Sequence, residues 1–199
     1  MSRVLILYGT TDGHTRKIAD VLAATFRDEG CRINVVDADQ ATPLQLDDYD
    51  GVIVAASIHI GGYQRSVRRW VHEHAAWLSR MPTAFLSVCL GILELRPEAQ
   101  REVERIMQTF LNQTGWQPTT TMPVAGAVPY TRYNWLKKQI MRRIVRKAGG
   151  DIDTSRDFEY TDWDGLRAFA RSFARAHGLA SSWLGTAYRP PAAAPEARV

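Results

Sequence analysis

Two patterns of hydrophobic and polar positions follow one another along the chain. Short runs of mostly apolar, often β-branched residues, bounded by glycine, threonine or proline, indicate strands that are buried in a sheet. The predicted strands are Val4–Tyr8, Arg32–Val36, Gly51–Ala56, Thr83–Val88 and Thr121–Val128. Val4–Tyr8 and Gly51–Ala56 contain no polar side chain, so we expect them at the centre of the sheet.

Between these runs, apolar residues recur every three or four positions, which is the period of an amphipathic helix. The predicted helices are His14–Arg27, Arg65–Leu78, Glu98–Thr114 and Asp164–Ala176. Thr161 and Asp164 have the spacing of a capping box, so Thr161 is the expected N-cap of the last helix. Alternation of strands and helices predicts an α/β fold in which helices cover both faces of a parallel sheet.

Two segments depart from this alternation. About 35 residues connect the fifth strand to Trp163, and Ser155–Tyr160 within them resembles a short extra strand. A connection of this length is uncommon in a compact domain and suggests a function. The sequence beyond Gly178 is rich in alanine, proline and serine, so we predict one domain over residues 1–178, with an insertion at 129–153, and a mobile tail over 179–199.

The 199 residues suffice for one domain with a full core. Cys31 and Cys89 lie in apolar surroundings without the spacing of metal ligands, which favours two buried thiols in a reducing compartment. The first residues form too short an apolar run for a signal peptide, and no segment approaches the roughly 20 apolar residues of a membrane span. We therefore expect a cytoplasmic protein.

The net charge of +4 comes from a single segment. Residues 129–150 contain seven basic side chains and no acidic one, whereas outside them 18 basic side chains face 21 acidic ones. On a helical projection Leu136, Ile140 and Ile144 lie on one side and Arg142, Arg143 and Arg146 on the other. A basic amphipathic helix of this kind is typical of a segment at an anionic membrane surface. A charged helix packed on its own domain is the alternative, and no motif points to nucleic acid.

The sequence YGTTDGHT joins the first strand to the first helix. A strand, a short glycine loop and a helix start together form a phosphate site, because the helix offers unpaired N–H groups and the positive end of its dipole. The loop lacks the lysine of a triphosphate-binding loop and the three glycines of a dinucleotide fingerprint, which favours the terminal phosphate of a mononucleotide. The candidate ligand residues are Thr10, Thr11, Asp12, Gly13, His14 and Thr15. A plain turn capped by Thr10 or Asp12 is the alternative.

The third and fourth strands end in SIHIGGY and SVCLGIL, which combine small polar residues, apolar residues and glycine. Ligands of open parallel sheets bind beyond the carboxyl ends of the strands, and a flat aromatic ring requires such apolar contacts and close backbone approach. The candidate residues are Ser57, Ile58, His59, Ile60, Gly61, Gly62, Tyr63, Ser87, Val88, Cys89, Leu90 and Gly91, with Tyr63 stacked on the ring. We interpret His14 and His59 as hydrogen-bonding residues of these loops, and no residue pattern indicates a metal site.

Val4–Thr15 resembles the signature of the flavodoxin family in its apolar strand, Tyr8, Thr10, Gly13 and Thr15. This resemblance implies a three-layer fold with a five-stranded parallel sheet of order 2-1-3-4-5, a long insertion at the fifth strand, and FMN as the cofactor. The first loop would bind the FMN phosphate, and the two later loops would hold the ring, so that no side chain of the protein is needed as a catalytic residue.

More closely, TDGHTRKIA, ASIHIGGY, AGAVPYTRYNW and YTDW resemble the menaquinone-dependent protoporphyrinogen IX dehydrogenases, a flavodoxin-like family of haem synthesis. The resemblance implies oxidation of protoporphyrinogen IX and transfer of electrons to a membrane quinone, at the inner face of the plasma membrane. A soluble flavodoxin electron carrier, an NAD(P)H:quinone reductase and a membrane-bound scaffold remain as alternatives, and a homo-oligomer is compatible with the sequence. Candidate contacts to substrate or membrane in the insertion are Tyr130, Arg132, Tyr133, Trp135, Lys137, Lys138, Arg142, Arg143, Arg146 and Lys147.

Overall fold

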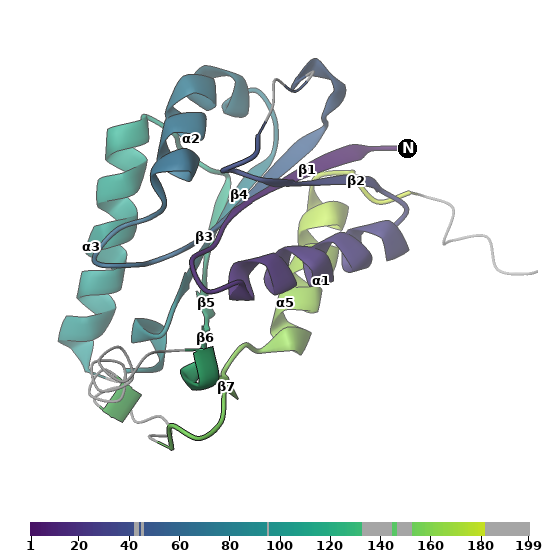
Figure 1. Cartoon of the computed structure of the whole chain (residues 1–199). Helices are drawn as coiled ribbons and strands as arrows, with labels where there is room; N and C mark the ends of the chain where they lie inside the picture. The colour runs from purple at the N-terminus through teal and green to yellow at the C-terminus, as the bar shows by residue number, and fades with distance from the viewer. Residues whose placement is uncertain (42–43, 45, 95, 133–144, 147–152, 182–199) are drawn as a thin grey trace, which may run out of the picture.

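A five-stranded parallel sheet forms the centre of the molecule (Figure 1). The computed structural model describes residues 1–41, 44, 46–94, 96–132, 145–146 and 153–181. The strand order is β2-β1-β3-β4-β5, which confirms the predicted sheet. The strands are β1 (Arg3–Gly9), β2 (Arg32–Asp37), β3 (Gly51–Ser57), β4 (Thr83–Cys89) and β5 (Thr120–Ala125).

Helices of the described residues cover both faces of the sheet (Figure 1). α1 (His14–Asp28) and α5 (Trp163–Ala176) cover one face, and α2 (Arg65–Leu78) and α3 (Pro97–Thr114) cover the other. The predicted helices therefore differ from the observed ones by at most one residue at either end. Short 3-10 turns complete the described connections: η1 (Leu46–Asp48), η2 (Gly91–Leu93) and η3 (Tyr130–Arg132).

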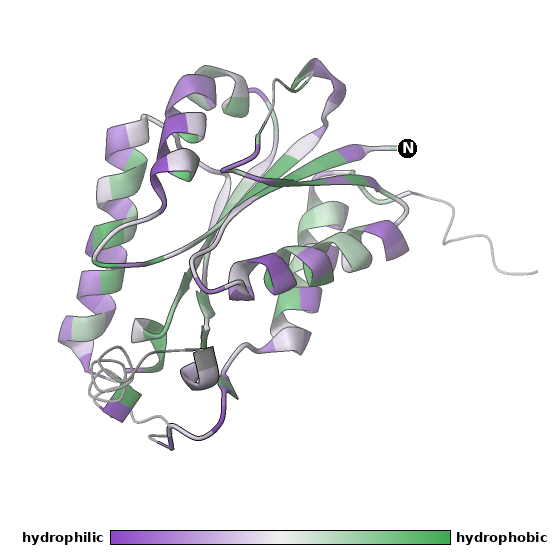
Figure 2. Cartoon of the chain, in the orientation of Figure 1, coloured by the Kyte–Doolittle hydropathy of each residue, from purple (hydrophilic) through white to green (hydrophobic). Residues whose placement is uncertain are grey.

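Alternate residues of β1 supply the two halves of the core. Val4, Ile6 and Tyr8 pack with α1 and α5, whereas Leu5 and Leu7 pack with α2 and α3. Figure 2 shows hydrophobic residues along the strands and polar residues on the outer sides of the helices. Because a fully buried aliphatic side chain contributes about 1.5–3 kcal/mol, this double burial fixes β1 at the centre and positions the loop that follows it.

The predicted fifth strand is interrupted at Gly126, which is a correction to the sequence prediction. β5 ends at Ala125, opposite the end of β4 at Cys89, and beyond this point β4 offers no further partner. β6 (Ala127–Val128) instead pairs in antiparallel fashion with β7 (Phe158–Glu159), the short strand predicted within Ser155–Tyr160. The second pair places the segment after the insertion beside the end of the main sheet.

Two further predictions near the carboxyl terminus are wrong. The N-cap of α5 is Asp162, whose carboxylate accepts a hydrogen bond from Gly165 N at 2.9 Å, while Thr161 makes other contacts described below. Leu179 is buried in the core, and Ser181 N donates to Glu29 O at 2.8 Å, so the packed domain extends to Ser181. The remainder of the predicted tail, residues 182–199, lies outside the described residues.

Candidate functional site

A cavity of about 580 Å³ lies at the carboxyl ends of β1, β3 and β4. Its volume is within the usual range of small-molecule and cofactor sites. From the predicted loops it is lined by Thr10–Asp12, His14 and Thr15, by Ser57–Ile60, and by Val88–Gly91. The structure thus brings together residues from three loops that are distant in sequence, and it does so at the edge of the sheet where open α/β folds bind their ligands.

The first loop has the geometry of a phosphate cradle. Gly13 has φ 90°, a left-handed conformation that favours glycine, and its N–H donates to Thr10 Oγ1 at 2.9 Å. α1 begins at the next residue, His14, so the N–H groups of its first turn face the cavity end of the loop. Gly13 therefore stabilises the bend of the loop through its backbone, although it is not among the residues that line the cavity.

The hydroxyl of Thr15 tests whether a phosphate group fits this loop. Thr15 is the second residue of α1, is only 1% exposed and lines the cavity. Among the described residues its Oγ1 has no hydrogen-bond partner. A buried polar atom without a partner costs about 1–3 kcal/mol, so such an atom at the start of a helix calls for a ligand. An anionic oxygen placed there would accept from this hydroxyl and from the helix N–H groups together.

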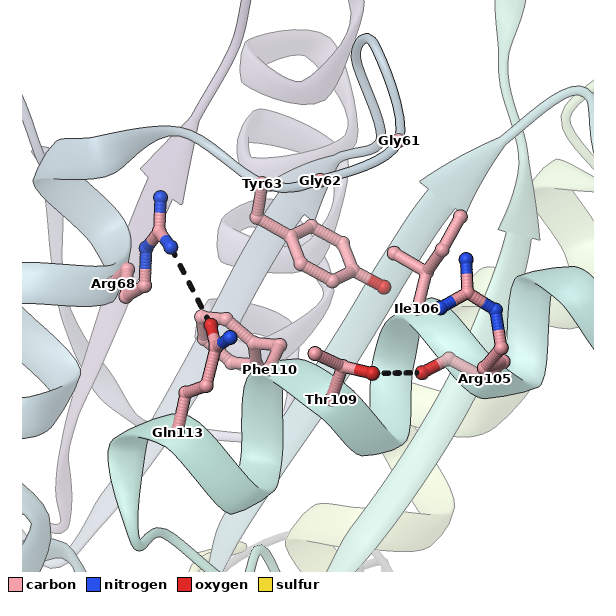
Figure 3. Close-up of a pocket in the computed structure, with 9 residues that line it drawn as sticks. All are labelled: Gly61, Gly62, Tyr63, Arg68, Arg105, Ile106, Thr109, Phe110 and Gln113. Atoms are coloured by element: carbon pink, nitrogen blue, oxygen red, sulfur yellow. Dashed lines mark hydrogen bonds between the residues drawn. The ribbon is translucent and has the colours of Figure 1, made fainter.

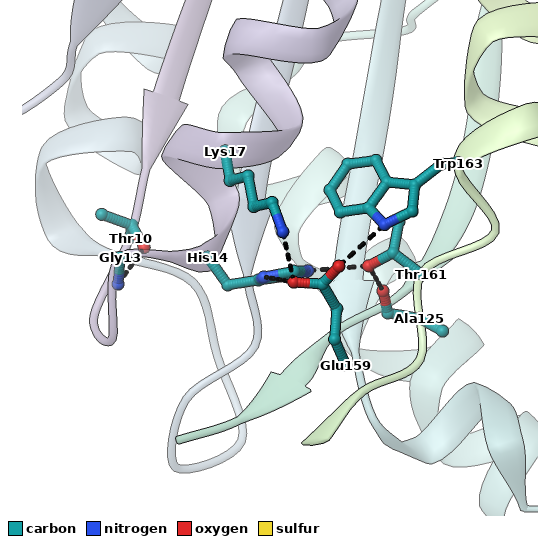
Figure 4. A network of polar contacts seen from close by, with 8 residues as sticks. All are labelled: Thr10, Gly13, His14, Lys17, Ala125, Glu159, Thr161 and Trp163. Carbon is teal, nitrogen blue, oxygen red and sulfur yellow. Dashed lines mark hydrogen bonds and ion pairs between the residues drawn. The ribbon is translucent and has the colours of Figure 1, made fainter. Parts of the chain in front are cut away.

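His14 is fixed by a residue from the far end of the chain (Figure 4). Its Nε2 lies 2.7 Å from Thr161 Oγ1, and this hydroxyl donates its single proton to Ala125 O at 2.6 Å. The hydroxyl must therefore accept from His14, which makes Nε2 the protonated nitrogen. Burial lowers the pKa of His14; Glu159, 3.8 Å from Nδ1, opposes this shift, and Lys17 adds to it. The imidazole is thus held in its neutral form beside the first loop.

Glu159 joins β7 to α1 and α5 (Figure 4). Its carboxylate accepts from Lys17 Nζ at 2.6 Å and from Trp163 Nε1 at 2.7 Å. Burial acts to raise the pKa of Glu159, but the hydrogen bonds from Lys17 and Trp163 outweigh it and hold the pKa below its usual range. The residues that follow the insertion are thereby attached to the start of α1, a connection that the sequence patterns did not reveal.

The second loop is a tight hairpin. His59 and Gly62 exchange backbone hydrogen bonds of 2.8 and 3.2 Å, and the two residues between them, Ile60 and Gly61, have φ of 48° and 74°. Two successive left-handed residues characterise a type I′ turn, in which a β-branched residue is unusual. Ile60 is 95% exposed at the tip. Gly61 and Gly62 do not line the cavity, in contrast to the prediction.

Gln64 connects the first two loops and was not predicted as a site residue. Its Nε2 donates to Ser57 Oγ at 2.8 Å and to Thr11 Oγ1 at 3.1 Å. The amide therefore occupies one side of both hydroxyls and fixes the separation of the loops. A cavity between loops held in this way is largely formed before a ligand binds.

Tyr63 and Ser87 do not face the cavity. Tyr63 is 7% exposed and packs edge-on against Phe85 and Phe110, and its hydroxyl lies 2.6 Å from Oγ of the fully buried Ser87. Burial raises the pKa of Tyr63 well above its usual range. The predicted stacking of Tyr63 on a ring in the cavity is therefore wrong, because the aromatic side chain is needed in the core between β4 and α3.

The apolar wall of the cavity includes residues that sequence reasoning missed. Val103 and Ile106 come from α3, and Gly126 and Ala127 from the break between β5 and β6. A Cβ atom at Gly91 would lie 2.8 Å from Val103 Cγ2, so the glycine permits this close approach of α3. Burial raises the pKa of Cys89, which keeps its thiol neutral. A ring bound here would contact aliphatic side chains and backbone rather than charged groups.

Of the predicted insertion contacts, only a few belong to the described residues. Tyr130 is fully buried with Val128 and Val145, so its ring lies in a small core rather than at a surface; the predicted contact of Tyr130 with substrate or lipid is wrong in this arrangement. Arg146 is exposed beside buried Val145, as expected for an amphipathic helix. The following lie outside the described residues, or, for Arg132, have no described side chain: Arg132, Tyr133, Trp135, Lys137, Lys138, Arg142, Arg143 and Lys147.

A flavodoxin domain matches residues 5–155, the part of the chain that builds β1 to β5 and all three loops. The chain belongs to the flavodoxin family. Among solved structures, flavodoxin 1 from Bacillus cereus is 16% identical, with a TM-score of 0.53 over 87% of this chain and 98% of that one, which supports the fold. Membership in this family suggests a flavin as the ligand of the cavity.

Two curated relatives of this chain have the names of enzymes. Protoporphyrinogen IX dehydrogenase [quinone] from Escherichia coli K12 is 34% identical over 86% of this chain and 94% of its own length. The protein of the same name from Leishmania major is 38% identical over 86% of this chain and 74% of its own length. No helix within the described residues is long and apolar enough to cross a membrane.

Proposed function

We propose that this member of the flavodoxin family is an FMN-dependent protoporphyrinogen IX dehydrogenase of haem synthesis that passes electrons to a quinone. The observation that carries the proposal is the 34–38% identity to enzymes of that name over 86% of the chain. The cavity supports it independently, because it combines an anion-binding helix start with apolar walls. Bound FMN would supply the redox chemistry, and the protein would supply binding, orientation and exclusion of water.

The first loop would hold the phosphate. Thr15 Oγ1 would donate to a phosphate oxygen, together with the N–H groups of the first turn of α1. His14 stays neutral and is turned towards Thr161, so it orients the loop rather than supplying charge. A loop that contributes hydroxyls and N–H groups without a cation suits the single terminal phosphate of FMN.

The second and third loops would hold the ring system. Ile58 and Ile60 contribute one apolar side, and Leu90 contributes another together with Val103 and Ile106 of α3. These side chains would exclude water from the ring, which would favour electron transfer from the porphyrinogen and onward to the quinone over side reactions with solvent. No general base is assigned among these side chains, because bound FMN would supply the electron-accepting chemistry.

The test uses purified protein reconstituted with FMN, protoporphyrinogen IX and a soluble menaquinone analogue under strictly anaerobic conditions. We expect the appearance of porphyrin fluorescence that requires both the protein and the quinone. A matched sample without quinone should give almost no porphyrin, because conversion of a porphyrinogen to a porphyrin releases six electrons and one bound FMN accepts only two. A protein that binds FMN but gives no quinone-dependent porphyrin would refute the enzymatic proposal, and one that cannot be reconstituted with FMN would refute the cofactor as well.

The same assay separates the alternatives. NADH or NADPH in place of protoporphyrinogen would reduce the quinone if the protein were an NAD(P)H:quinone reductase, and we expect no such reaction. A flavodoxin carrier would accept electrons from a reductase and donate them to a partner protein but would leave protoporphyrinogen unchanged. Rapid quinone reduction by NADPH without porphyrin formation would therefore favour the reductase.

We also propose that the basic segment over residues 129–150 attaches the enzyme to the inner face of the plasma membrane, where the quinone resides. Each basic side chain near anionic lipid contributes about 1 kcal/mol, so the seven cations suffice for reversible attachment. Sedimentation with phosphatidylglycerol liposomes measures this binding. Binding should fall strongly when Arg142, Arg143 and Arg146 are replaced by glutamate, and unchanged binding would contradict the proposal.

A further inference from the structure

A second, smaller pocket lies beside the flavin cavity and has no assigned role (Figure 3). Its volume is about 150 Å³, and it lies between the hairpin before α2 and the middle of α3. Gly61 and Gly62 line it, whereas the preceding hairpin residues line the flavin cavity. Ile106 lines both. The two pockets are thus neighbours that share one side chain of α3 and one hairpin.

The small pocket has an apolar floor and a cationic rim. Tyr63 and Phe110 form the floor, and both are almost completely buried. Arg68 from α2 and Arg105 from α3 stand at its edge with their guanidinium groups on either side of the Tyr63 ring (Figure 3). This combination suits a ligand that has a short aliphatic arm and an anionic end.

Both guanidinium groups retain N–H groups for a ligand. Arg68 uses Nη1 to approach Gln113 Oε1 at 3.4 Å, and Arg105 uses Nε and Nη2 to hold Glu102 at 2.8 and 2.7 Å. An arginine has five N–H donors, so neither contact uses all of them. The pair with Glu102 is exposed, and exposed pairs contribute little, so an incoming carboxylate could add to it or replace it at small cost.

The size of the pocket restricts what it can bind. A water molecule takes about 30 Å³ in the liquid, so 150 Å³ corresponds to a handful of waters. A flavin or a tetrapyrrole ring is far too large for it, because such ligands occupy several hundred Å³. A carboxylate on an arm of two methylene groups fits. Arginine is suited to carboxylates through paired N–H···O bonds.

We propose that Arg68 and Arg105 bind a propionate arm of the porphyrinogen while its ring system lies at the mouth of the flavin cavity. The inference rests on the proposed function, which supplies a substrate with two such arms. The methylene groups of the arm pack against Tyr63 and Phe110, and Ile106, which lines both pockets, lies between the arm and the porphyrinogen ring system. Substrates without a carboxylate would lose this anchor.

Binding is tested without turnover, with the oxidised porphyrin as probe. The FMN-loaded protein is titrated with protoporphyrin IX and, separately, with its uncharged dimethyl ester, and binding is followed by quenching of flavin or tryptophan fluorescence. We expect Arg68→Gln and Arg105→Gln each to raise the Kd of the diacid at least fivefold and to leave the Kd of the diester within twofold. FMN content and melting temperature should stay those of the wild type.

Arg101→Gln is the matched control. Arg101 lies one turn before Arg105 on α3 and pairs with Glu98 at the same three-residue spacing, but it does not line the pocket. We expect wild-type binding of both probes. If the double variant of Arg68 and Arg105 binds the diacid as the control does, the propionate site is refuted, whether or not the enzyme is active. If the site variants weaken the diacid and the wild type shows no porphyrinogen oxidation, the proposed function alone fails.

Discussion

Nε2 of His14 and Oγ1 of Thr161 lie 2.7 Å apart although 147 residues separate them in the sequence. Thr161 donates in turn to Ala125 O at the end of β5. The first turn of α1, the break in the fifth strand and the residue before the N-cap of α5 therefore meet at one hydroxyl. This hydroxyl, together with the Glu159 carboxylate, links the start of α1 to the segment after the insertion.

Replacing Thr161 by valine should destabilise the protein. Valine has nearly the same shape but leaves both His14 Nε2 and Ala125 O without their partner, and each unpaired buried group costs about 1–3 kcal/mol. We expect the free energy of unfolding in urea to fall by about 2 kcal/mol. Thr121→Val, at an exposed position of β5, is the control and should change it by less than about 0.5 kcal/mol. Equal effects of the two variants would contradict the role of the hydroxyl.

The neutral His14 predicts a pH dependence of stability. Burial lowers the pKa of His14 from the model-peptide value of 6.5, so on acidification the unfolded chain takes up the proton before the folded one does. The contribution of His14 is therefore complete above pH 6.5 and is lost as the pH falls towards the lower pKa of the folded protein. Unfolding of the FMN-free protein, measured between pH 7.5 and 5, should show a decline that is shallower in His14→Gln. The exposed His72→Gln should retain the wild-type slope.

Features that depend on the local pattern of residues could be predicted from the sequence. Val4–Tyr8 could be assigned to the sheet centre because a run without polar residues has to be covered on both faces. The loop Thr10–Thr15 could be placed between a strand and a helix start, and so proposed as a phosphate site, because this local geometry depends little on the rest of the fold. The boundaries of the helices and of the first four strands agree within one residue for the same reason, whereas the predicted fifth strand ends three residues too late.

Features that depend on distant contacts could not be predicted in this way. Thr161 and Asp162 are adjacent, and either residue type is favourable at an N-cap. In the structure the Thr161 hydroxyl is bonded to His14 and Ala125, so Asp162 is the residue that caps α5. Tyr63 follows two glycines, which suggested a ring contact at the surface, but Phe110 from α3 packs against it in the core. Leu179 was assigned to a mobile tail, but its side chain is buried in the core and the backbone after it is held by hydrogen bonds to Ala174 and Glu29.

The pair of Tyr63 and Ser87 predicts a structural rather than a cofactor role. Tyr63→Phe keeps the ring in place but removes the partner of the buried Ser87 hydroxyl, so we expect a loss of about 1–2 kcal/mol in the free energy of unfolding. The affinity for FMN should not change. The double variant with Ser87→Ala should be no less stable than Tyr63→Phe alone, because both polar atoms are then absent. A large loss of FMN affinity in Tyr63→Phe would instead favour a contact with the ring.

The left-handed turn at the hairpin tip predicts a pair of opposite effects. Ile60 has φ 48° and is 95% exposed, so its side chain gains no burial to offset a conformation that costs a β-branched residue about 1–2 kcal/mol. Ile60→Asn should raise the free energy of unfolding of the FMN-free protein by about 0.5–1 kcal/mol, because asparagine tolerates this region. Gly61→Ala, at φ 74° and with open space around it, should lower it by a similar amount. Stabilisation by both variants would show that the turn is not left-handed.

A substitution at Thr15 should affect binding of the cofactor without affecting the stability of the fold. Its buried hydroxyl has no partner among the described residues, so Thr15→Val should leave the FMN-free protein as stable as the wild type, or slightly more stable. If the hydroxyl donates to the phosphate, the Kd of FMN should rise roughly tenfold, which corresponds to about 1.4 kcal/mol. Thr25→Val is the control on the same helix, because the Thr25 hydroxyl donates to Val21 O, away from the loop. Its FMN affinity, measured by flavin fluorescence quenching, should equal that of the wild type. An unchanged Kd in Thr15→Val would mean that the N–H groups of α1 alone hold the phosphate.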